Sequence, residues 1–173
     1  MSSPGIEKIR GRWLETDSMA GVGIDPNIQR IPAEIWEQVG GTDYISEGIT
    51  LFNQGVIDAT ADFAVDFKVN SNYFQGELGR KALQNTFDYL KLEHPSVLRV
   101  CDGKFGDVQH TAEEIAEEIF GKLDADAVVL NPYLGFDGIG AFTKWSDKLV
   151  ILCVNTSNPS ASDQDFHNRP ANQ

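Results

Sequence analysis

Short apolar runs alternate with helix-like segments along this chain of 173 residues, and this alternation limits its possible folds more than any other feature. The pattern is typical of α/β proteins in which helices join parallel strands. The last run holds six consecutive apolar residues, which predicts a strand covered on both faces. The runs span 20–26, 62–68, 97–102, 126–130 and 148–154, with helices predicted over 42–61, 79–93 and 137–145 and from Thr111, where Thr-Ala-Glu-Glu forms a capping-box pattern.

Composition indicates a folded protein that is soluble in water. The hydrophobic fraction of 41% and the ten phenylalanines argue against disorder, and no apolar run approaches the ~18 residues of a membrane span. A formal net charge of −12 argues against nucleic acid as a partner but leaves room for a local pocket that binds a phosphorylated small molecule. Without a secretory leader, Cys101 and Cys153 are expected to be reduced thiols of a cytoplasmic protein.

Polar side chains occur where the predicted strands end. Each has an ordinary structural explanation: Asp25 precedes Pro26 and suits a turn, and a lone Lys68 is usually a surface lysine. Their repetition at the ends of consecutive strands favours a functional rim instead. The residues concerned are Asp25, Asp66, Lys68, Asp102, Lys104, Asn131 and 156–158.

The densest charge lies in the stretch 100–107, Val-Cys-Asp-Gly-Lys-Phe-Gly-Asp. Successive strand side chains point to opposite faces, so Asp102 and Lys104 are predicted to share one face. A charge pair on the inward side of a strand end is costly to bury unless it is paired or used. Barrels of the α/β class carry their catalytic groups at this place, although a purely structural ion pair remains an alternative.

These residues resemble a known family. Asp102-x-Lys104-x-x-Asp107 looks like the signature of the orotidine 5′-phosphate decarboxylases, and 21–26 (Gly-Val-Gly-Ile-Asp-Pro) and 67–70 (Phe-Lys-Val-Asn) are similar to the family's first two strand motifs. The segments 130–137 and 156–159 resemble strand ends of its longer bacterial subgroup. The resemblance implies a (β/α)₈ TIM barrel. Residues 1–156 would supply its first five βα units, and 157–173 would be a polar tail or the start of a loop.

The resemblance also implies a reaction, the decarboxylation of orotidine 5′-phosphate to uridine 5′-phosphate without a cofactor or metal. Lys104 would give a proton to the pyrimidine carbon that loses carbon dioxide, and Asp102 would lie near the departing carboxylate. Lys68 would complete an alternating lysine–aspartate array. Asp107 and Thr111 would reach into the site of a neighbouring subunit, which implies a homodimer with shared sites.

Three more residues would bind substrate if the resemblance holds. Asp25 would hold a ribose hydroxyl, Asn70 belongs to the lysine-bearing second-strand segment, and Ser157 would contact the pyrimidine ring. No residue matches the arginine with which the family's last strands grip the substrate phosphate, and Arg169 in the polar segment is not assigned that role.

Other hypotheses stay open. Phe105 after the lysine and the extra acid Asp66 depart from the family pattern. A sister sugar-phosphate decarboxylase or synthase shares the Asp-x-Lys-x-x-Asp motif, and an inactive remnant that acts as an assembly partner would keep the same strands. If 173 residues are the whole chain, the fifth strand is expected to be an open barrel edge that something must cover.

Overall fold

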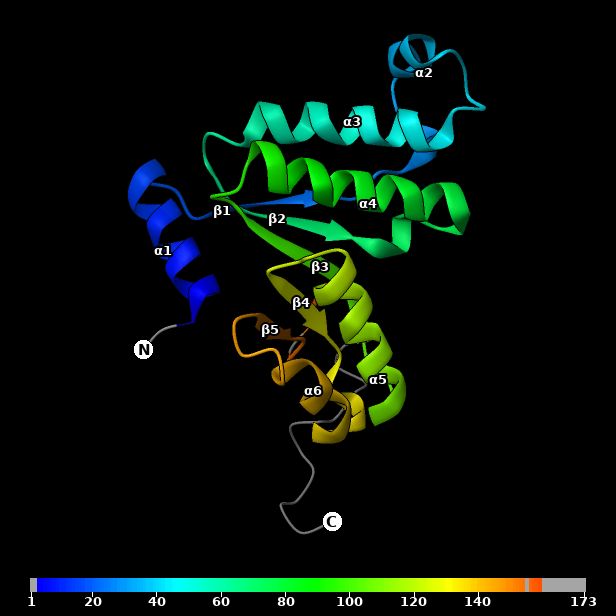
Figure 1. Cartoon of the computed structure of the whole chain (residues 1–173). Coiled ribbons are helices and arrows are strands. Elements are labelled where there is room, and N and C mark those ends of the chain that lie inside the picture. Colours follow the sequence, from blue (N-terminus) through cyan, green and yellow to red (C-terminus); the bar gives the residue numbers. More distant parts are fainter. Residues whose placement is uncertain (1–2, 155, 160–173) are drawn as a thin grey trace.

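The computed structural model describes residues 3–154 and 156–159, and its centre is one parallel sheet of five strands in chain order (Figure 1). Each strand pairs with the next one in parallel, as the alternation predicts. All five carboxyl ends therefore lie along the same edge. The strands are β1 (Ala20–Ile24), β2 (Ala64–Asn70), β3 (Leu98–Phe105), β4 (Ala127–Leu130) and β5 (Leu149–Leu152).

Four of the described helices form two pairs beside this sheet. Figure 1 shows α3 and α4 side by side along β1 and β2, with α5 and α6 packed together beside the other half of the sheet. Three short 3₁₀ turns, at Ile28–Arg30, Ser71–Tyr73 and Pro132–Leu134, follow β1, β2 and β4. The helices are α1 (Pro4–Thr16), α2 (Ala33–Val39), α3 (Ile45–Thr60), α4 (Gly76–Glu93), α5 (Gln109–Ala116, continued by a π-helical turn over Glu117–Lys122) and α6 (Phe136–Thr143).

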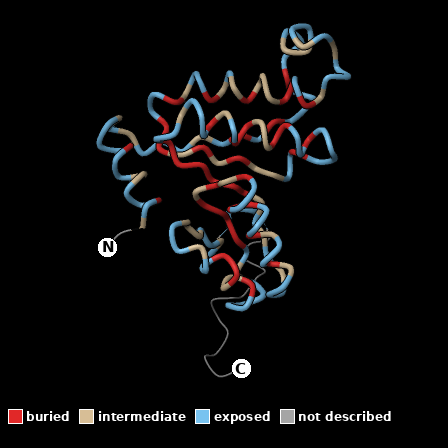
Figure 2. Tube along the Cα trace, in the orientation of Figure 1, coloured by how far each residue is buried: buried red, intermediate tan, exposed pale blue. Residues whose placement is uncertain are grey.

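Apolar side chains are buried on both faces of the sheet, and the buried stretches of Figure 2 follow its central strands. The larger cluster includes Phe67 of β2 and Phe87 of α4, both fully buried. A smaller cluster on β3 and β4 includes Leu98 and Val100, and Ile9 of α1 packs against it. Burial on both faces explains why these strands read as continuous apolar runs.

The fifth strand departs from that rule, so the prediction that both of its faces are covered is wrong for the described chain. Ile151 and Leu152 keep 42% and 40% of their surface exposed, and Leu149 and Val150 are only half-buried. The reason is that β5 pairs with β4 alone among the described residues, which leaves its other edge without a partner.

Helix α1 closes the amino-terminal edge of the sheet through charged contacts. Arg12 donates to the carbonyl oxygens of Ala61 and of Ala64, the latter at 3.0 Å. Lys8 Nζ lies 2.7 Å from Asp126 Oδ2, and the Arg99 guanidinium donates to both oxygens of that carboxylate at 3.0 and 2.9 Å. Burial opposes ionisation of Asp126, but the hydrogen bonds from Arg99 and Lys8 outweigh it and lower its pKa to about 2.

Most predicted elements are confirmed, with shifts at their ends. β2 begins and ends two residues after the predicted 62–68, and β3 runs on to Phe105 instead of stopping at Asp102. Helices α1 and α2 were not predicted. Gly5 and Gly11 interrupt the apolar spacing of α1, and α2 has only seven residues. Cys101 and Cys153 are free thiols, as predicted.

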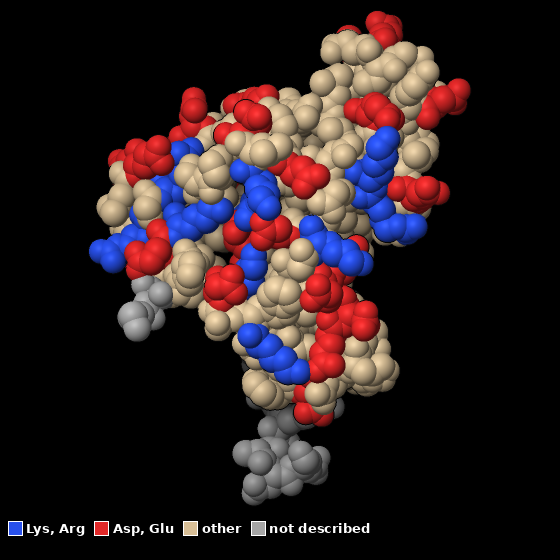
Figure 3. Space-filling view, viewed as in Figure 1, with Lys and Arg blue, Asp and Glu red and all other residues tan. Residues whose placement is uncertain are grey.

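The described surface shows mixed charge. Figure 3 shows acidic and basic side chains interspersed over the face in view, and exposed ion pairs such as Lys81–Glu47 at 3.1 Å join neighbouring helices. Within residues 3–154 and 156–159, no helix is both long and apolar enough to cross a membrane.

Two helical glycines give a test of the packing that positions the loop after β2. A Cβ on Gly79 would lie 2.5 Å from the backbone carbon of Phe74, whereas a Cβ on Gly55 would meet nothing within 4 Å. We expect Gly79→Ala to lower the free energy of unfolding by about 1–3 kcal/mol, because backbone must move. Gly55→Ala should raise it by about 0.5–1 kcal/mol through helix propensity. Urea unfolding measures both, and equal effects would contradict the assigned packing.

Candidate active site

The carboxyl edge of the sheet gathers most of the side chains that the sequence singled out. Asp25 directly follows β1, Lys68 and Asn70 lie at the end of β2, and Asp102 and Lys104 lie near the end of β3. Pairing of Asn70 with Asp102 aligns the ends of β2 and β3. Adjacent parallel strands in this register bring their terminal side chains within contact distance.

The Asp102 carboxylate is the centre of the site. Its side chain is only 3% exposed and contacts two ammonium groups: Lys68 Nζ lies 2.9 Å from Oδ2, and Lys104 Nζ lies 3.1 Å from both oxygens. Burial raises the pKa of Asp102, but the hydrogen bonds and charges of the two lysines outweigh it, so its pKa is lowered. The lysine side chains are 42% and 53% exposed. The site therefore consists of two solvent-accessible ammonium groups that both contact one buried, ionised carboxylate.

Lys104 reaches this position through an irregular strand end. The φ angle of Lys104 is 51°, which lies in the left-handed region. Cys101 pairs with Val128 and Phe105 pairs with Leu130, so β3 advances by four residues where β4 advances by two. The two additional residues form a bulge, a feature common beside active sites. Strict alternation, the basis of the prediction that Asp102 and Lys104 share a face, does not hold here. The bulge instead lets the Lys104 side chain fold back onto Asp102.

Hydrogen bonds tie the loop after β2 to both neighbouring strand ends. Asn70 Nδ2 donates to Asp25 Oδ1 at 2.8 Å, and Ser71 Oγ donates to the backbone oxygen of Asp102 at 3.0 Å. Asn70 Oδ1 also accepts from the amide of Asn72 at 3.3 Å. Sequence reasoning missed Ser71, because a single serine in a polar loop carries no signal that distinguishes it from its neighbours.

The glycines of the first strand make room for two acids. A Cβ on Gly21 would lie 2.6 Å from Asp66 Oδ2, and a Cβ on Gly23 would lie 2.8 Å from Asp25 Oδ2. Asp66 lies on β2 two residues before Lys68; burial raises its pKa, and the Lys68 charge opposes that rise. Gly21 and Gly23 thus leave the space that these two carboxylates occupy.

Within the described part of the chain, Asp107, Thr111 and Ser157 form no hydrogen bond or ion pair with the lysine–aspartate cluster. Asp107 Oδ1 accepts from the backbone amide of Val108 at 2.7 Å, and Ser157 is exposed in the segment after β5. Thr111 is half-buried in α5, and the prediction that it begins this helix is wrong. The chain is extended at Val108, so the helix already begins at Gln109. A single chain therefore assembles three members of the expected array, Lys68, Asp102 and Lys104.

Replacing the shared carboxylate tests the electrostatics of the cluster. The folded pKa of Asp102 is lowered, so its contribution to stability is present above the unfolded value of about 3.9 and is lost as the pH falls through the folded value. We expect Asp102→Asn to lower the free energy of unfolding by about 1–2 kcal/mol at pH 7, discounted for the half-exposed lysines.

The control is Asp88→Asn, which alters only an exposed carboxylate that accepts from Gln84 within α4 and should change stability by less than about 0.5 kcal/mol. Urea unfolding at pH 7 and at about pH 3 compares the variants with the parent chain. A difference for Asp102→Asn that does not shrink at the lower pH would contradict the assigned charge state.

Comparison with known proteins identifies the family and the fold of this chain. The profile of the orotidine 5′-phosphate decarboxylase / HUMPS family matches residues 54–172. Curated orotidine 5′-phosphate decarboxylases from Cellvibrio japonicus and Azoarcus sp. are 35% and 38% identical over 158 residues, which is 91% of this chain and 56% of each relative. The chain thus spans about half the length of the curated relatives it matches.

The structure of Leishmania donovani OMP decarboxylase superposes with a TM-score of 0.77 at 26% identity, covering 94% of this chain and 57% of that one. The five-stranded parallel sheet is accordingly part of a TIM-barrel architecture. The profile match over more than half of its residues establishes that this chain belongs to the orotidine 5′-phosphate decarboxylase / HUMPS family.

Proposed function

We propose that the protein decarboxylates orotidine 5′-phosphate to uridine 5′-phosphate, a step of pyrimidine biosynthesis. The observation that carries the proposal is the buried Asp102 carboxylate with Lys68 and Lys104 on its two sides, at the carboxyl edge of a parallel sheet. The names of the curated relatives favour this reaction over that of a sister sugar-phosphate enzyme.

The chemistry explains why such a cluster suits the reaction. Loss of carbon dioxide leaves an electron pair on a pyrimidine carbon that has no electron sink. A preorganised ammonium beside that carbon stabilises the developing charge more than it stabilises the ground state, because its position and orientation are fixed before the reaction. Lys104 is the proton donor in this proposal, and the proton it delivers replaces the carboxylate. No cofactor takes part.

Asp102 and Lys68 position that proton donor. Asp102 accepts hydrogen bonds from both lysines, and Ser71 donates to the backbone oxygen of Asp102. The Asp102 carboxylate also lies beside the departing carboxylate of the substrate, and repulsion between the two adds to the driving force. Asp25, held by Asn70, binds a ribose hydroxyl, and Ser157 contacts the pyrimidine ring.

A homodimer with shared sites is part of the proposal. Asp107 and Thr111 lie outside the cluster of their own chain, in keeping with a role in a neighbouring subunit. The backbone of Asp107 packs against α6, because a Cβ on Gly138 would lie 2.5 Å from its carbonyl oxygen. Large apolar side chains are exposed around this contact: Val108, Tyr133, Leu134 and Phe136 retain 51%, 66%, 50% and 74% of their surface. An apolar surface of this kind suits a subunit interface.

The remaining assignments follow from the same family. Residues 1–156 are proposed as the first five βα units of the barrel, and 157–173, of which only 157–159 are described, as a polar segment after them. The free thiols of Cys101 and Cys153 suit a reducing, cytoplasmic environment.

Turnover by the purified chain tests the reaction. We expect conversion of orotidine 5′-phosphate to uridine 5′-phosphate, followed by its absorbance change, and a loss of at least about 10³-fold in kcat for Lys104→Ala. The matched control is Lys144→Ala, which removes an exposed lysine paired with Glu113 and should leave kcat within about two-fold. Equal rates for Lys104→Ala and the parent chain would rule out the proposed proton donor.

Mixing two inactive variants tests the shared site. If Asp107 serves the neighbouring subunit, Lys104→Ala and Asp107→Ala chains that are unfolded and refolded together should form mixed dimers with one intact site. Random pairing makes half of the dimers mixed, so activity should recover to about a quarter of the parent value per site. Recovery no greater than the sum of the separate variants, together with a monomeric mass by ultracentrifugation, would contradict the shared site.

A further inference from the structure

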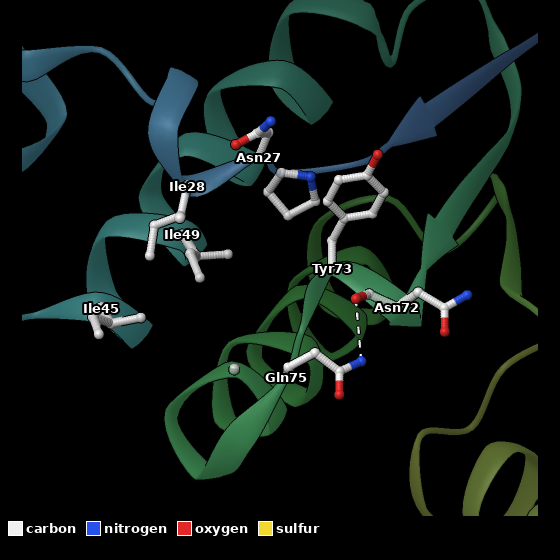
Figure 4. A pocket seen from close by; sticks show the side chains of 9 residues that line it. Asn27, Ile28, Ile45, Ile49, Asn72, Tyr73 and Gln75 are labelled. Atoms are coloured by element: carbon white, nitrogen blue, oxygen red, sulfur yellow. Dashed lines mark hydrogen bonds between the residues drawn. The ribbon is translucent and has the colours of Figure 1, made fainter.

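A pocket of about 420 Å³ opens beside the candidate active site, between the segment after β1 and the loop that joins β2 to α4 (Figure 4). Its volume lies within the range of small-molecule sites. Lys68, Asp102 and Lys104 are not among its lining residues, so the pocket is distinct from the lysine–aspartate cluster.

Apolar and aromatic side chains make up much of the pocket lining. In Figure 4, Ile28, Ile45 and Ile49 lie on one side, and Tyr73 with Gln75 lies on the other. Ile49 is buried, whereas Ile28 and Tyr73 keep 43% and 44% of their surface exposed. A flat ring that packs against the isoleucines or the tyrosine would remove apolar surface from water.

The polar side chains that line the pocket are uncharged. In Asn27 and Gln75, one of the two polar atoms of the side-chain amide is hydrogen-bonded within the chain. Among the described residues, the lining contains no Asp, Glu, Lys, Arg or His, so a charged ligand would lose hydration without gaining a countercharge from them. Asn27 Oδ1 accepts from the amide of Gln29 at 3.0 Å, and Gln75 Nε2 donates to the carbonyl of Asn72 at 3.1 Å. Within the described residues, Asn27 Nδ2 and Gln75 Oε1 have no hydrogen-bond partner. The lining thus offers amide donors and acceptors, together with the Tyr73 hydroxyl.

We propose that this pocket binds the base of a neutral nucleoside. A nucleobase combines a flat aromatic body with donors and acceptors along its edge, which are the groups that asparagine and glutamine amides recognise. The site borders the candidate active site, because Asn70 bonds both to Asp25 and to the backbone of Asn72, which lines the pocket. The inference does not depend on the decarboxylation proposed above.

The test is titration of the full chain with uridine and with adenosine, followed by saturation-transfer NMR and calorimetry. We expect at least one nucleoside to bind with a Kd of about 0.1–1 mM. Tyr73→Ala should weaken that binding by about 10-fold or more, since stacking on the ring is lost. Ile28→Ser, at an exposed isoleucine of the opposite wall, should weaken it as well and serves if Tyr73→Ala fails to fold.

Two control variants separate this pocket from its neighbours. Tyr44→Ala removes a tyrosine that is 52% exposed near the start of α3 and does not line the pocket, and Lys104→Ala alters the candidate active site. Both should keep the parent affinity within about two-fold. Absence of binding by both nucleosides up to about 10 mM would overturn the proposal. So would binding that Lys104→Ala abolishes and Tyr73→Ala preserves, because it would place the nucleoside in the lysine–aspartate cluster.

Discussion

The buried Asp102 carboxylate is the constraint on which the rest of the site depends. An ionised carboxylate that is 3% exposed is tolerable only when its charge is compensated nearby, and Lys68 and Lys104 provide that compensation. Lys68 meets it because β2 and β3 are adjacent and in register, and Lys104 meets it from the bulged end of the same strand as Asp102. The parallel sheet, the bulge and the hydrogen bond from Ser71 thus all help to position the groups around the Asp102 charge.

The two edges of the sheet use charge in different ways. At the amino edge, Asp126 accepts from Lys8 and Arg99, whose side chains are 20% and 9% exposed. The Lys8 ion pair fastens α1 to the sheet, and the Arg99 ion pair joins β3 to the residue before β4. At the carboxyl edge the lysines are about half-exposed and remain accessible to a ligand. This division matches barrels in general, in which one face maintains stability and the other carries the chemistry.

Sequence patterns predicted which strands form better than they predicted where a helix begins or whether a strand is covered. The apolar runs gave all five strands, since burial on both faces leaves a continuous signal. Helix α1 was not predicted because it lacks an apolar stripe. Charged contacts hold it in place, together with the packing of Ile9. The capping-box pattern predicted that the helix begins at Thr111. The helix begins two residues earlier because the chain leaving β3 is extended only as far as Val108. The sixfold apolar run predicted a covered strand, yet coverage depends on neighbours that local sequence does not specify.

The amino-acid sequence by itself determined the order of strands and helices and the placement of acids and lysines at strand ends, because both depend on local periodicity. Tertiary structure decided which of these groups meet. Lys68 and Asp102 are 34 positions apart, and Asn70 and Asp25 are 45 apart, so their contacts follow from strand register. The same is true of the space that Gly21 leaves for Asp66 and of the pocket walls around Tyr73. Register is set by packing of the whole sheet, and for that reason no single motif encodes these contacts.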